Sequence, residues 1–172
     1  SKIFTVPIIN DFLNESSAES FRITISGAQN VNTSMPMSIN NTIADVSILN
    51  DDPILTMIGQ GSVIESAGFA TYTVTLSSAQ TYSVSVNYAT SNQGAISPSD
   101  YTATTGTLIF EPSEASKTFT VPIINDFLNE SSSETFRMTI SNAQNANEIM
   151  PMSINNSVVD VSITNDDPIL NL

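Results

Sequence analysis

The sequence SKTFTVPIINDFLNESSSETFRMTIS at residues 116–141 carries two features from which the fold can be predicted, an internal repeat and an alternating apolar pattern. It occurs almost unchanged at residues 1–26, as SKIFTVPIINDFLNESSAESFRITIS. The likeness extends without a gap, so that residues 1–57 align with residues 116–172, and 43 of the 57 pairs are identical. Repetition at an offset of 115 residues indicates tandem units of about domain size, of which this chain holds one and a half.

The boundary between units is predicted at the tetrapeptide Asn-Asp-Asp-Pro, found at 50–53 and again at 165–168. Proline lacks a backbone donor and disfavours helix before it, so it marks the edge of an element. We therefore expect residues 54–168 to form a complete unit. We expect residues 1–53 to be the C-terminal half of the preceding unit, and residues 169–172 to begin the next.

Apolar and polar residues alternate along the complete unit, which is the period of a β-strand with one buried face. Six such series run over Tyr72–Leu76, Val84–Tyr88, Leu108–Phe110, Phe119–Ile123, Phe136–Ile140 and Val159–Ile163. Clusters of Asn, Ser, Gly and Pro separate them, as expected of turns. About seven short strands in a unit of this length predict an all-β fold, an immunoglobulin-like antiparallel β-sandwich in tandem repeats. A closed barrel is the alternative, but the sequence holds no signal for closure.

The half-unit at residues 1–53 has three of these series, at Phe4–Ile8, Phe21–Ile25 and Ala44–Ile48. Three strands with one apolar face and no opposing sheet cannot bury that face. Either the natural chain continues upstream or a neighbouring chain supplies the missing strands. We expect the first, and interpret the sequence as an excerpt from a longer tandem array.

Composition excludes several classes of function. Of 172 residues, 17 are acidic and only 4 are basic, which gives a formal net charge of −13, and there is no Cys, His or Trp. Disulfides, Cys or His metal sites and His-dependent catalysis are therefore excluded. The basic residues are too few for a nucleic-acid surface, and no apolar run is long enough to span a membrane. Asp126 and Glu130 would be the carboxylate pair of a glycosidase, but few aromatic residues exist to line a sugar cleft, so we expect no enzyme.

Seven acidic residues of the complete unit stand at or near the ends of predicted strands. They are Glu65, Asp100, Asp126, Glu130, Glu134, Asp166 and Asp167. Because alternate strands of a sandwich end at the same pole, these carboxylates are predicted to meet there. Few protein cations are present to neutralise them, whereas a hard divalent cation, calcium or magnesium, prefers such all-oxygen ligands. The alternative is that these carboxylates only cap turns and solubilise the surface.

The order of motifs resembles the Calx-beta domain family. The motifs are VIESAG at 63–68, GAI at 94–96, SDYTATTGTLIFEP at 99–112, SKTFTVPIINDFLNE at 116–130 and VSITNDDP at 161–168. The resemblance covers the complete unit, and the half-unit matches the second half of the family pattern. It implies an immunoglobulin-like sandwich with calcium ligands at one pole, near the junction with the next domain. Such domains occur in sodium–calcium exchangers, in an integrin subunit and as tandem arrays in large secreted bacterial surface proteins.

The resemblance also implies which residues bind calcium. In the complete unit these are Glu65, Asp100, Asp126, Leu128 through its carbonyl, Glu130, Asn165, Asp166 and Asp167. In the half-unit they are Asp11, Leu13, Glu15, Asp51 and Asp52, an incomplete set. Glu134 is a further candidate, although its spacing from Glu130 is one residue longer than usual. Asn125 and Asn165 replace residues that are often Asp in the family, which lowers the charge and predicts one or two ions.

Together these features predict a non-enzymatic structural repeat of a long secreted or cell-surface protein, such as an adhesin, stalk or filament, rigidified by calcium at the repeat junction. The expected partners are neighbouring repeats, and identical chains in a filament. Two other functions stay open. A calcium-sensing regulatory domain would bind calcium more tightly and change conformation. A carbohydrate- or surface-binding adhesin module would be stabilised by glycans and not by calcium.

Overall fold

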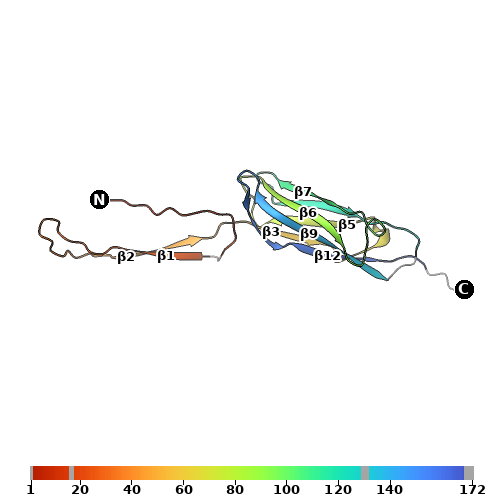
Figure 1. Ribbon diagram of the computed structural model, residues 1–172, viewed down its shortest axis with the longest axis horizontal. Helices are drawn as coiled ribbons and strands as arrows, with labels where there is room; N and C mark the ends of the chain where they lie inside the picture. Colours follow the sequence, from red (N-terminus) through yellow and green to blue (C-terminus); the bar gives the residue numbers. More distant parts are fainter. Residues whose placement is uncertain (1, 16–17, 129–131, 169–172) are drawn as a thin grey trace. The chain divides into compact units, whose positions relative to one another are not determined.

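The computed structural model of the chain describes residues 2–15, 18–128 and 132–168 (Figure 1). The predicted start of a further repeat at 169–172 lies outside these ranges. The chain divides into a larger compact unit, Ser1–Leu13 with Pro53–Leu172, and a smaller unit, Asn14–Asp52. Along the described ranges, no helix has the length and apolarity needed to cross a membrane.

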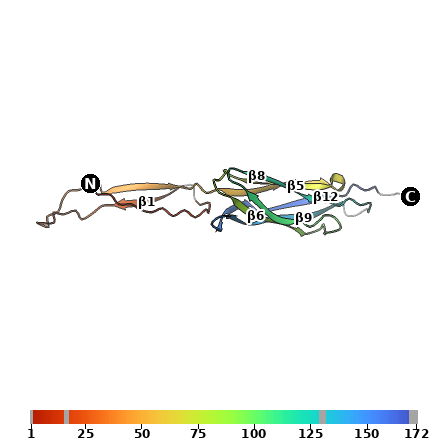
Figure 2. The same ribbon diagram turned by 90° about the horizontal axis from the view of Figure 1, so that it is seen from above.

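The larger unit is a sandwich of two β-sheets. One sheet has the order β4 (Ser62–Ile64), β12 (Val158–Thr164), β9 (Ser133–Asn145), β6 (Val84–Asn92) and β7 (Thr105–Phe110), with β10 (Met150–Pro151) beside β9. The other has the order β11 (Ser153–Asn156), β3 (Ile54–Gly59), β5 (Phe69–Leu76) and β8 (Ser116–Pro122). Figure 2 shows β5 and β8 in one layer and β6 and β9 in the other.

The predicted all-β, immunoglobulin-like fold is confirmed. Seven of the described strands in this unit have six residues or more, namely β3, β5, β6, β7, β8, β9 and β12. Their pairings are antiparallel. Two short strands depart from the antiparallel pattern, because β4 pairs with β12 and β11 pairs with β3 in parallel.

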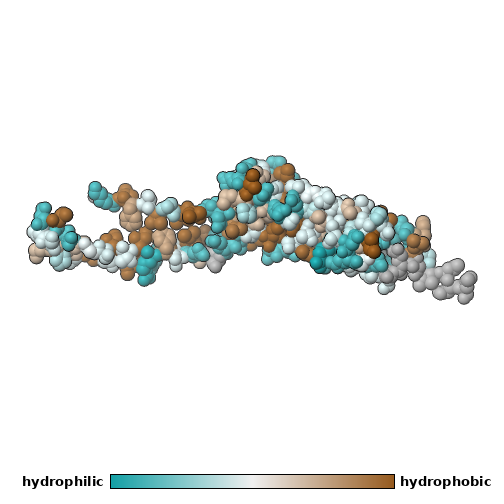
Figure 3. Space-filling view, viewed as in Figure 1, coloured by the Kyte–Doolittle hydropathy of each residue, from teal (hydrophilic) through white to brown (hydrophobic). Residues whose placement is uncertain are grey.

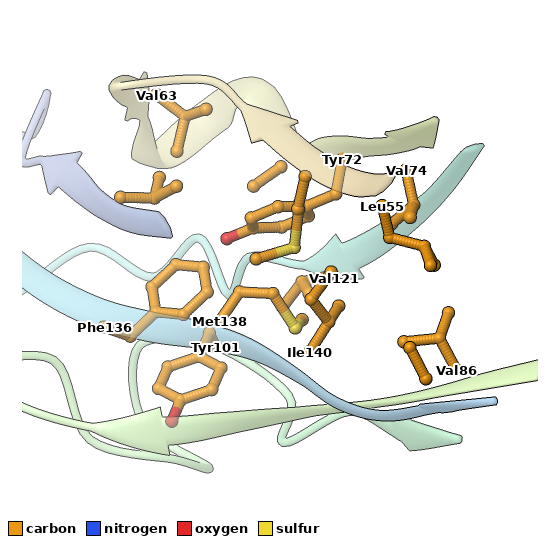
Figure 4. Packing of buried hydrophobic residues seen from close by; sticks show 14 of the residues in the cluster. Leu55, Val63, Tyr72, Val74, Val86, Tyr101, Val121, Phe136, Met138 and Ile140 are labelled. Carbon is orange, nitrogen blue, oxygen red and sulfur yellow. The ribbon is translucent and has the colours of Figure 1, made fainter. Parts of the chain in front are cut away.

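Side chains from the two sheets interdigitate in a single core. Tyr72 and Val121, from one sheet, face Phe136 and Met138 of β9, in the other (Figure 4). All four are fully buried, because the period-two pattern turns every second side chain inward. Each fully buried side chain of this kind contributes roughly 1.5–3 kcal/mol. This core holds the strand ends, and thus the loops between them, in fixed positions.

The smaller unit is an antiparallel hairpin of β1 (Ala18–Thr24) and β2 (Ile43–Leu49). Ala18 pairs with Leu49, as Ser133 pairs with Thr164 at the equivalent positions of β9 and β12. The exposed ion pairs also repeat. Arg22 Nε lies 2.7 Å from Asp45 Oδ1, and Arg137 and Asp160 form the same pair at the same distance. The hairpin thus keeps the register of the complete unit, and two of the three strands predicted for the half-unit are confirmed.

The predicted third strand, at Phe4–Ile8, is wrong. Residues 2–15 contain no strand, although they repeat the sequence of β8. In the complete unit β8 is an edge strand, and β5 is its only partner strand among the described residues. The chain contains only one copy of the β5 sequence, and that copy already pairs with β8. Alternation alone therefore does not produce a strand here, because the segment lacks its ladder partner.

Candidate metal centre

Three carboxylates from separate loops gather at one pole of the sandwich. Glu65, Asp126 and Asp167 each offer an oxygen, and these oxygens all lie within 4.8 Å of one another. We call these three residues the carboxylate cluster. Among the described residues, no second group of three potential metal ligands is found. Each of the three residues comes from a different one of the predicted motifs. Their proximity agrees with the prediction that carboxylates at strand ends meet at one pole.

Strand register explains why the three residues meet. The parallel pairing of β4 with β12 ends at Ile64 beside Thr164, so both strands leave the sheet at the same point. Glu65 opens a short 3₁₀ helix (η1, Glu65–Ala67), and Gly68 ends it in the left-handed region at φ +79°. The amide of Ile123, just after β8, donates to the carbonyl of Gly68 at 3.0 Å. That bond brings the loop containing Asp126 alongside Glu65.

Local turns fix the cluster further. The amide of Asp126 donates to Glu65 Oε1 at 3.2 Å, which links two members directly. Asp126 Oδ1 accepts the amide of Leu128 at 2.7 Å, and Asn165 Oδ1 accepts the amide of Asp167 at 2.8 Å. Such side-chain-to-backbone turns are typical of Asp and Asn. Asp126 and Asn165 therefore close backbone turns at the same pole where the three carboxylates meet.

The electrostatics of the cluster disfavour three bare charges. Glu65 is only 5% exposed. Burial raises the pKa of the Glu65 carboxyl, as do the nearby carboxylates of Asp167 and Asp126, and only the Asp126 amide opposes them. Three of the four basic side chains are paired elsewhere, with Asp45, Glu114 and Asp160. None of the ion pairs among the described residues includes a carboxylate of the cluster, so a cation from outside the chain would lower its charge repulsion.

Asp167 provides the test of whether a cation fits. Its Oδ2 atom is buried and has no hydrogen-bond partner among the described residues. A buried polar atom without a partner costs roughly 1–3 kcal/mol, and more when it is charged. A cation between the three carboxylates would satisfy that oxygen. With oxygen donors only, the cluster suits a hard divalent ion such as calcium, and not zinc.

The other predicted ligands of the complete unit, where the structure describes them, lie outside the carboxylate cluster and differ in burial and in hydrogen bonding. Asp166 is exposed and accepts a hydrogen bond from the Ser66 hydroxyl. Asp100 is buried, and its Oδ2 accepts the amide of Ile96 at 2.5 Å, which closes a turn. Leu128 is exposed, Asn165 is half-buried, and Glu134 is half-buried on β9 opposite Ile163. Glu130 lies outside the described residues. Ser66 was not among the predicted site residues, although it stands beside Glu65 in the VIESAG motif.

The half-unit residues show part of the same turn chemistry. Asp11 Oδ1 accepts the amide of Leu13 at 3.0 Å, which repeats the turn at Asp126. Asn50 Oδ1 accepts the amide of Asp52 at 3.0 Å, which repeats the turn at Asp167. Asp11 and Leu13 belong to the larger unit, whereas Glu15, Asp51 and Asp52 belong to the smaller one. Their role as ligands stays a prediction.

Glu65 makes the metal-free protein sensitive to pH. Because its folded pKa is raised, the folded state binds a proton more tightly than the unfolded state. Its contribution to stability is therefore complete below its unfolded pKa, about 4.3, and is lost as the pH rises through the folded value. We expect the unfolding free energy of the wild type, minus that of Glu65→Gln, to decrease as the pH rises above about 4.3. Urea unfolding in EDTA measures it, and a difference that rises with pH would contradict this electrostatic account.

Comparisons with known proteins identify the family and support the fold. The family model of the Calx-beta domain matches residues 1–52 and 54–167. The apo form of the Calx CBD1 domain is 23% identical, with a TM-score of 0.57, over 66% of this chain and 98% of that one. The Calx CBD2 domain is 19% identical, with a TM-score of 0.59, over 66% and 86%. The calcium binding domain CBD12 of CALX1.1 is 24% identical, with a TM-score of 0.58, over 66% and 44%. These structural likenesses support the fold. A search of curated proteins finds no match.

Proposed function

The chain belongs to the Calx-beta domain family, and from that membership we propose that it is a non-enzymatic structural module that binds calcium at the carboxylate cluster. The observation that carries this proposal is Asp167 Oδ2, a buried acceptor without a hydrogen-bond partner among the described residues, in a group with Glu65 and Asp126. An ion supplies the charge that the surrounding protein lacks.

The ligand set favours weak binding of calcium. Calcium takes six to eight oxygen ligands in flexible geometry, whereas magnesium demands a near-ideal octahedron. Three carboxylates from three loops supply only part of a calcium shell, so carbonyl groups and water complete it. Asn125 and Asn165 add no charge, and we propose one or two ions. Dissociation constants of about 10⁻⁴–10⁻³ M, typical of extracellular modules, follow from such a site.

We assign the ion a mechanical role at the repeat junction. Asp167 directly precedes Pro168, the predicted last residue of the complete unit, so an ion on Asp167 restrains the start of whatever follows. Near-identical repeats joined by Asn-Asp-Asp-Pro with almost no linker suit a stiff rod. We therefore propose a repeat of a secreted or cell-surface adhesin, stalk or filament. Its partners are neighbouring repeats and, in a filament, identical chains.

A calcium-sensing domain is the second candidate. It is supported by the similarity to the structure described as the calcium binding domain CBD12 of CALX1.1. Regulation by calcium requires tight binding and a change of conformation. The two Asn residues at 125 and 165 lower the negative charge and favour the structural role. A dissociation constant well below 10⁻⁵ M would favour the sensor, because sensor sites bind at about 10⁻⁷–10⁻⁵ M.

Thermal unfolding tests the structural proposal. A ligand that binds only the folded state stabilises it by about 0.4 kcal/mol at its dissociation constant and about 1.4 kcal/mol at ten times that concentration. We expect millimolar calcium to raise the melting temperature by several degrees over EDTA, and Asp167→Asn to abolish the rise. Asp45→Asn is the matched control, because it removes one exposed carboxylate far along the sequence from the cluster. No rise in the wild type, or equal losses in both variants, would overturn the proposal.

The contact between Phe12 and Tyr82 suggests how the loop that contains Phe127 packs at a repeat junction. Phe12 packs edge-to-face against Tyr82 within the larger unit, with ring centroids 5.3 Å apart, and joins the edge of its core. Its repeat equivalent, Phe127, is 90% exposed. The same loop position thus contributes to packing in one copy and is open to solvent in the other. We propose that Phe127 packs in the same way against the unit that follows.

Truncating the two phenylalanines should have unequal effects. Phe12→Ala removes an aromatic pair and partly buried apolar area, so we expect a loss of about 1–2 kcal/mol in unfolding free energy. Phe127→Ala should change it by less than about 0.5 kcal/mol, as for other exposed sites. Urea unfolding of both variants checks this, and equal losses would show that Phe12 does not stabilise the larger unit.

A further inference from the structure

Apolar side chains on one face of the smaller unit are exposed among the described residues. Figure 3 shows brown, apolar surface on the part of the chain that holds β1 and β2. Ile25, Met37 and Val46 are 49%, 58% and 37% exposed. Their equivalents one repeat later are Ile140, Met152 and Val161, which are 5% exposed or less. The same residue types are therefore core in one copy and surface in the other.

The hairpin also has an open backbone edge. In the complete unit, β9 is hydrogen-bonded on one edge to β12 and on the other to β6. Its equivalent, β1, pairs only with β2 among the described residues. An unpaired strand edge next to an apolar face is the usual template for strand addition.

We propose that the β1–β2 hairpin is a docking surface for the first half of a repeat, a polypeptide of the chemistry of residues 54–115. The repeat itself identifies this occupant. Residues 54–115 provide β6, which covers the second edge of β9, and the core residues of β3 and β5 that face it. The hairpin keeps the register of β9 and β12, so it already has the conformation that this partner binds. Docking also provides a β5-like partner strand for residues 2–7, the described equivalents of β8.

This inference does not depend on the proposed calcium site, so its experiment is done in EDTA. The complete chain is mixed with a separately produced polypeptide of residues 54–115. Hydrogen exchange of the β1 and β2 amides is then followed. We expect exchange to slow about 100-fold, since these amides would join a cooperative core, and to saturate at one polypeptide per chain.

A matched pair of variants tests the face that docks. Ile23 and Thr24 are neighbours on β1, and Ile23 is the half-buried one, equivalent to the fully buried Met138. Ile23→Asp would bury an unpaired charge and should abolish the protection. Thr24→Asp adds the same charge on the opposite face and should preserve it. Protection that survives Ile23→Asp would overturn the proposal.

A fusion keeps the test decisive if the free polypeptide aggregates. Attaching residues 54–115 to Ser1 recreates the natural sequence around Ala115–Ser116, because Ser1 and Ser116 are repeat equivalents. We expect the β1 and β2 amides of the fused chain to exchange as slowly as those of β9 and β12. Unchanged rapid exchange in the fusion would refute the proposal. The unfused chain could instead self-associate, in a way that Ile23→Asp abolishes, while the fusion shows no protection of β1 and β2. That result would identify a second copy of the chain as the occupant and would also refute the proposal.

Discussion

Glu65→Gln is expected to stabilise the metal-free protein and to destabilise the calcium-bound protein, both relative to wild type. In EDTA the substitution removes a nearly buried negative charge that lies beside Asp126 and Asp167, while keeping the size of the side chain. Burial and those neighbours are what raise the pKa of Glu65, so the neutral amide relieves the same unfavourable charge. In millimolar calcium, one to ten times the proposed dissociation constant, the variant loses a ligand and with it about 0.4–1.4 kcal/mol of stabilisation.

The change of sign makes this experiment more discriminating than a simple loss of binding. Melting temperatures of wild type and Glu65→Gln, each in EDTA and in millimolar calcium, are compared. A variant that is merely damaged would melt earlier in both solutions. Asp45→Asn serves as control, since its carboxylate pairs with Arg22 on the surface and should matter little in either solution. A lower melting temperature for Glu65→Gln in EDTA would contradict the proposed charge repulsion.

Phe136→Ala is expected to lose about 3–5 kcal/mol of unfolding free energy, the usual cost of deleting a buried phenylalanine. Phe136 is fully buried between the sheets and stacks on Tyr101 at a centroid distance of 4.4 Å. Phe21 occupies the equivalent position of the half-unit, where it is only half-buried. We expect Phe21→Ala to cost less than about 1 kcal/mol, because no opposing sheet covers it.

Urea unfolding followed by far-ultraviolet circular dichroism measures both losses. A domain of this size has a stability of roughly 5–15 kcal/mol, so the Phe136 variant approaches the limit of folding. Phe136→Leu, which keeps most of the apolar volume, should then give a smaller, measurable loss of about 1–2 kcal/mol. Equal costs at positions 21 and 136 would show that the half-unit already has a core of its own.

Alternation predicted the strands that have one face in the core and one in water. It found β5, β6, β7, β8, β9 and β12 because their polar and apolar residues alternate. It did not find β3, since Ile54–Gly59 reads ILTMIG and has no clean period. It also failed at Phe4–Ile8, where the pattern is present and the pairing partner is absent. Strand formation there depends on a tertiary contact that the local sequence does not contain.

The sequence was similarly informative about the candidate site. Glu65, Asp126 and Asp167 were predicted to converge because they follow strands that end at one pole, and they do converge. The turn that engages Asp100 with Ile96, and the hydrogen bond from Ser66 to Asp166, could not be predicted. Both depend on the path of the backbone within a loop, which neither periodicity nor the order of motifs specifies.

Calorimetric titration of calcium into the metal-free chain tests the central claim most directly. We predict saturable binding of one or two ions with a dissociation constant of about 10⁻⁴–10⁻³ M. We predict that Asp167→Asn weakens this binding at least about tenfold, which corresponds to about 1.4 kcal/mol, because Oδ2 of this carboxylate is buried and has no hydrogen-bond partner among the described residues. Absence of saturable binding at millimolar calcium, or unchanged binding by Asp167→Asn, would contradict the proposal that the carboxylate cluster is a calcium site.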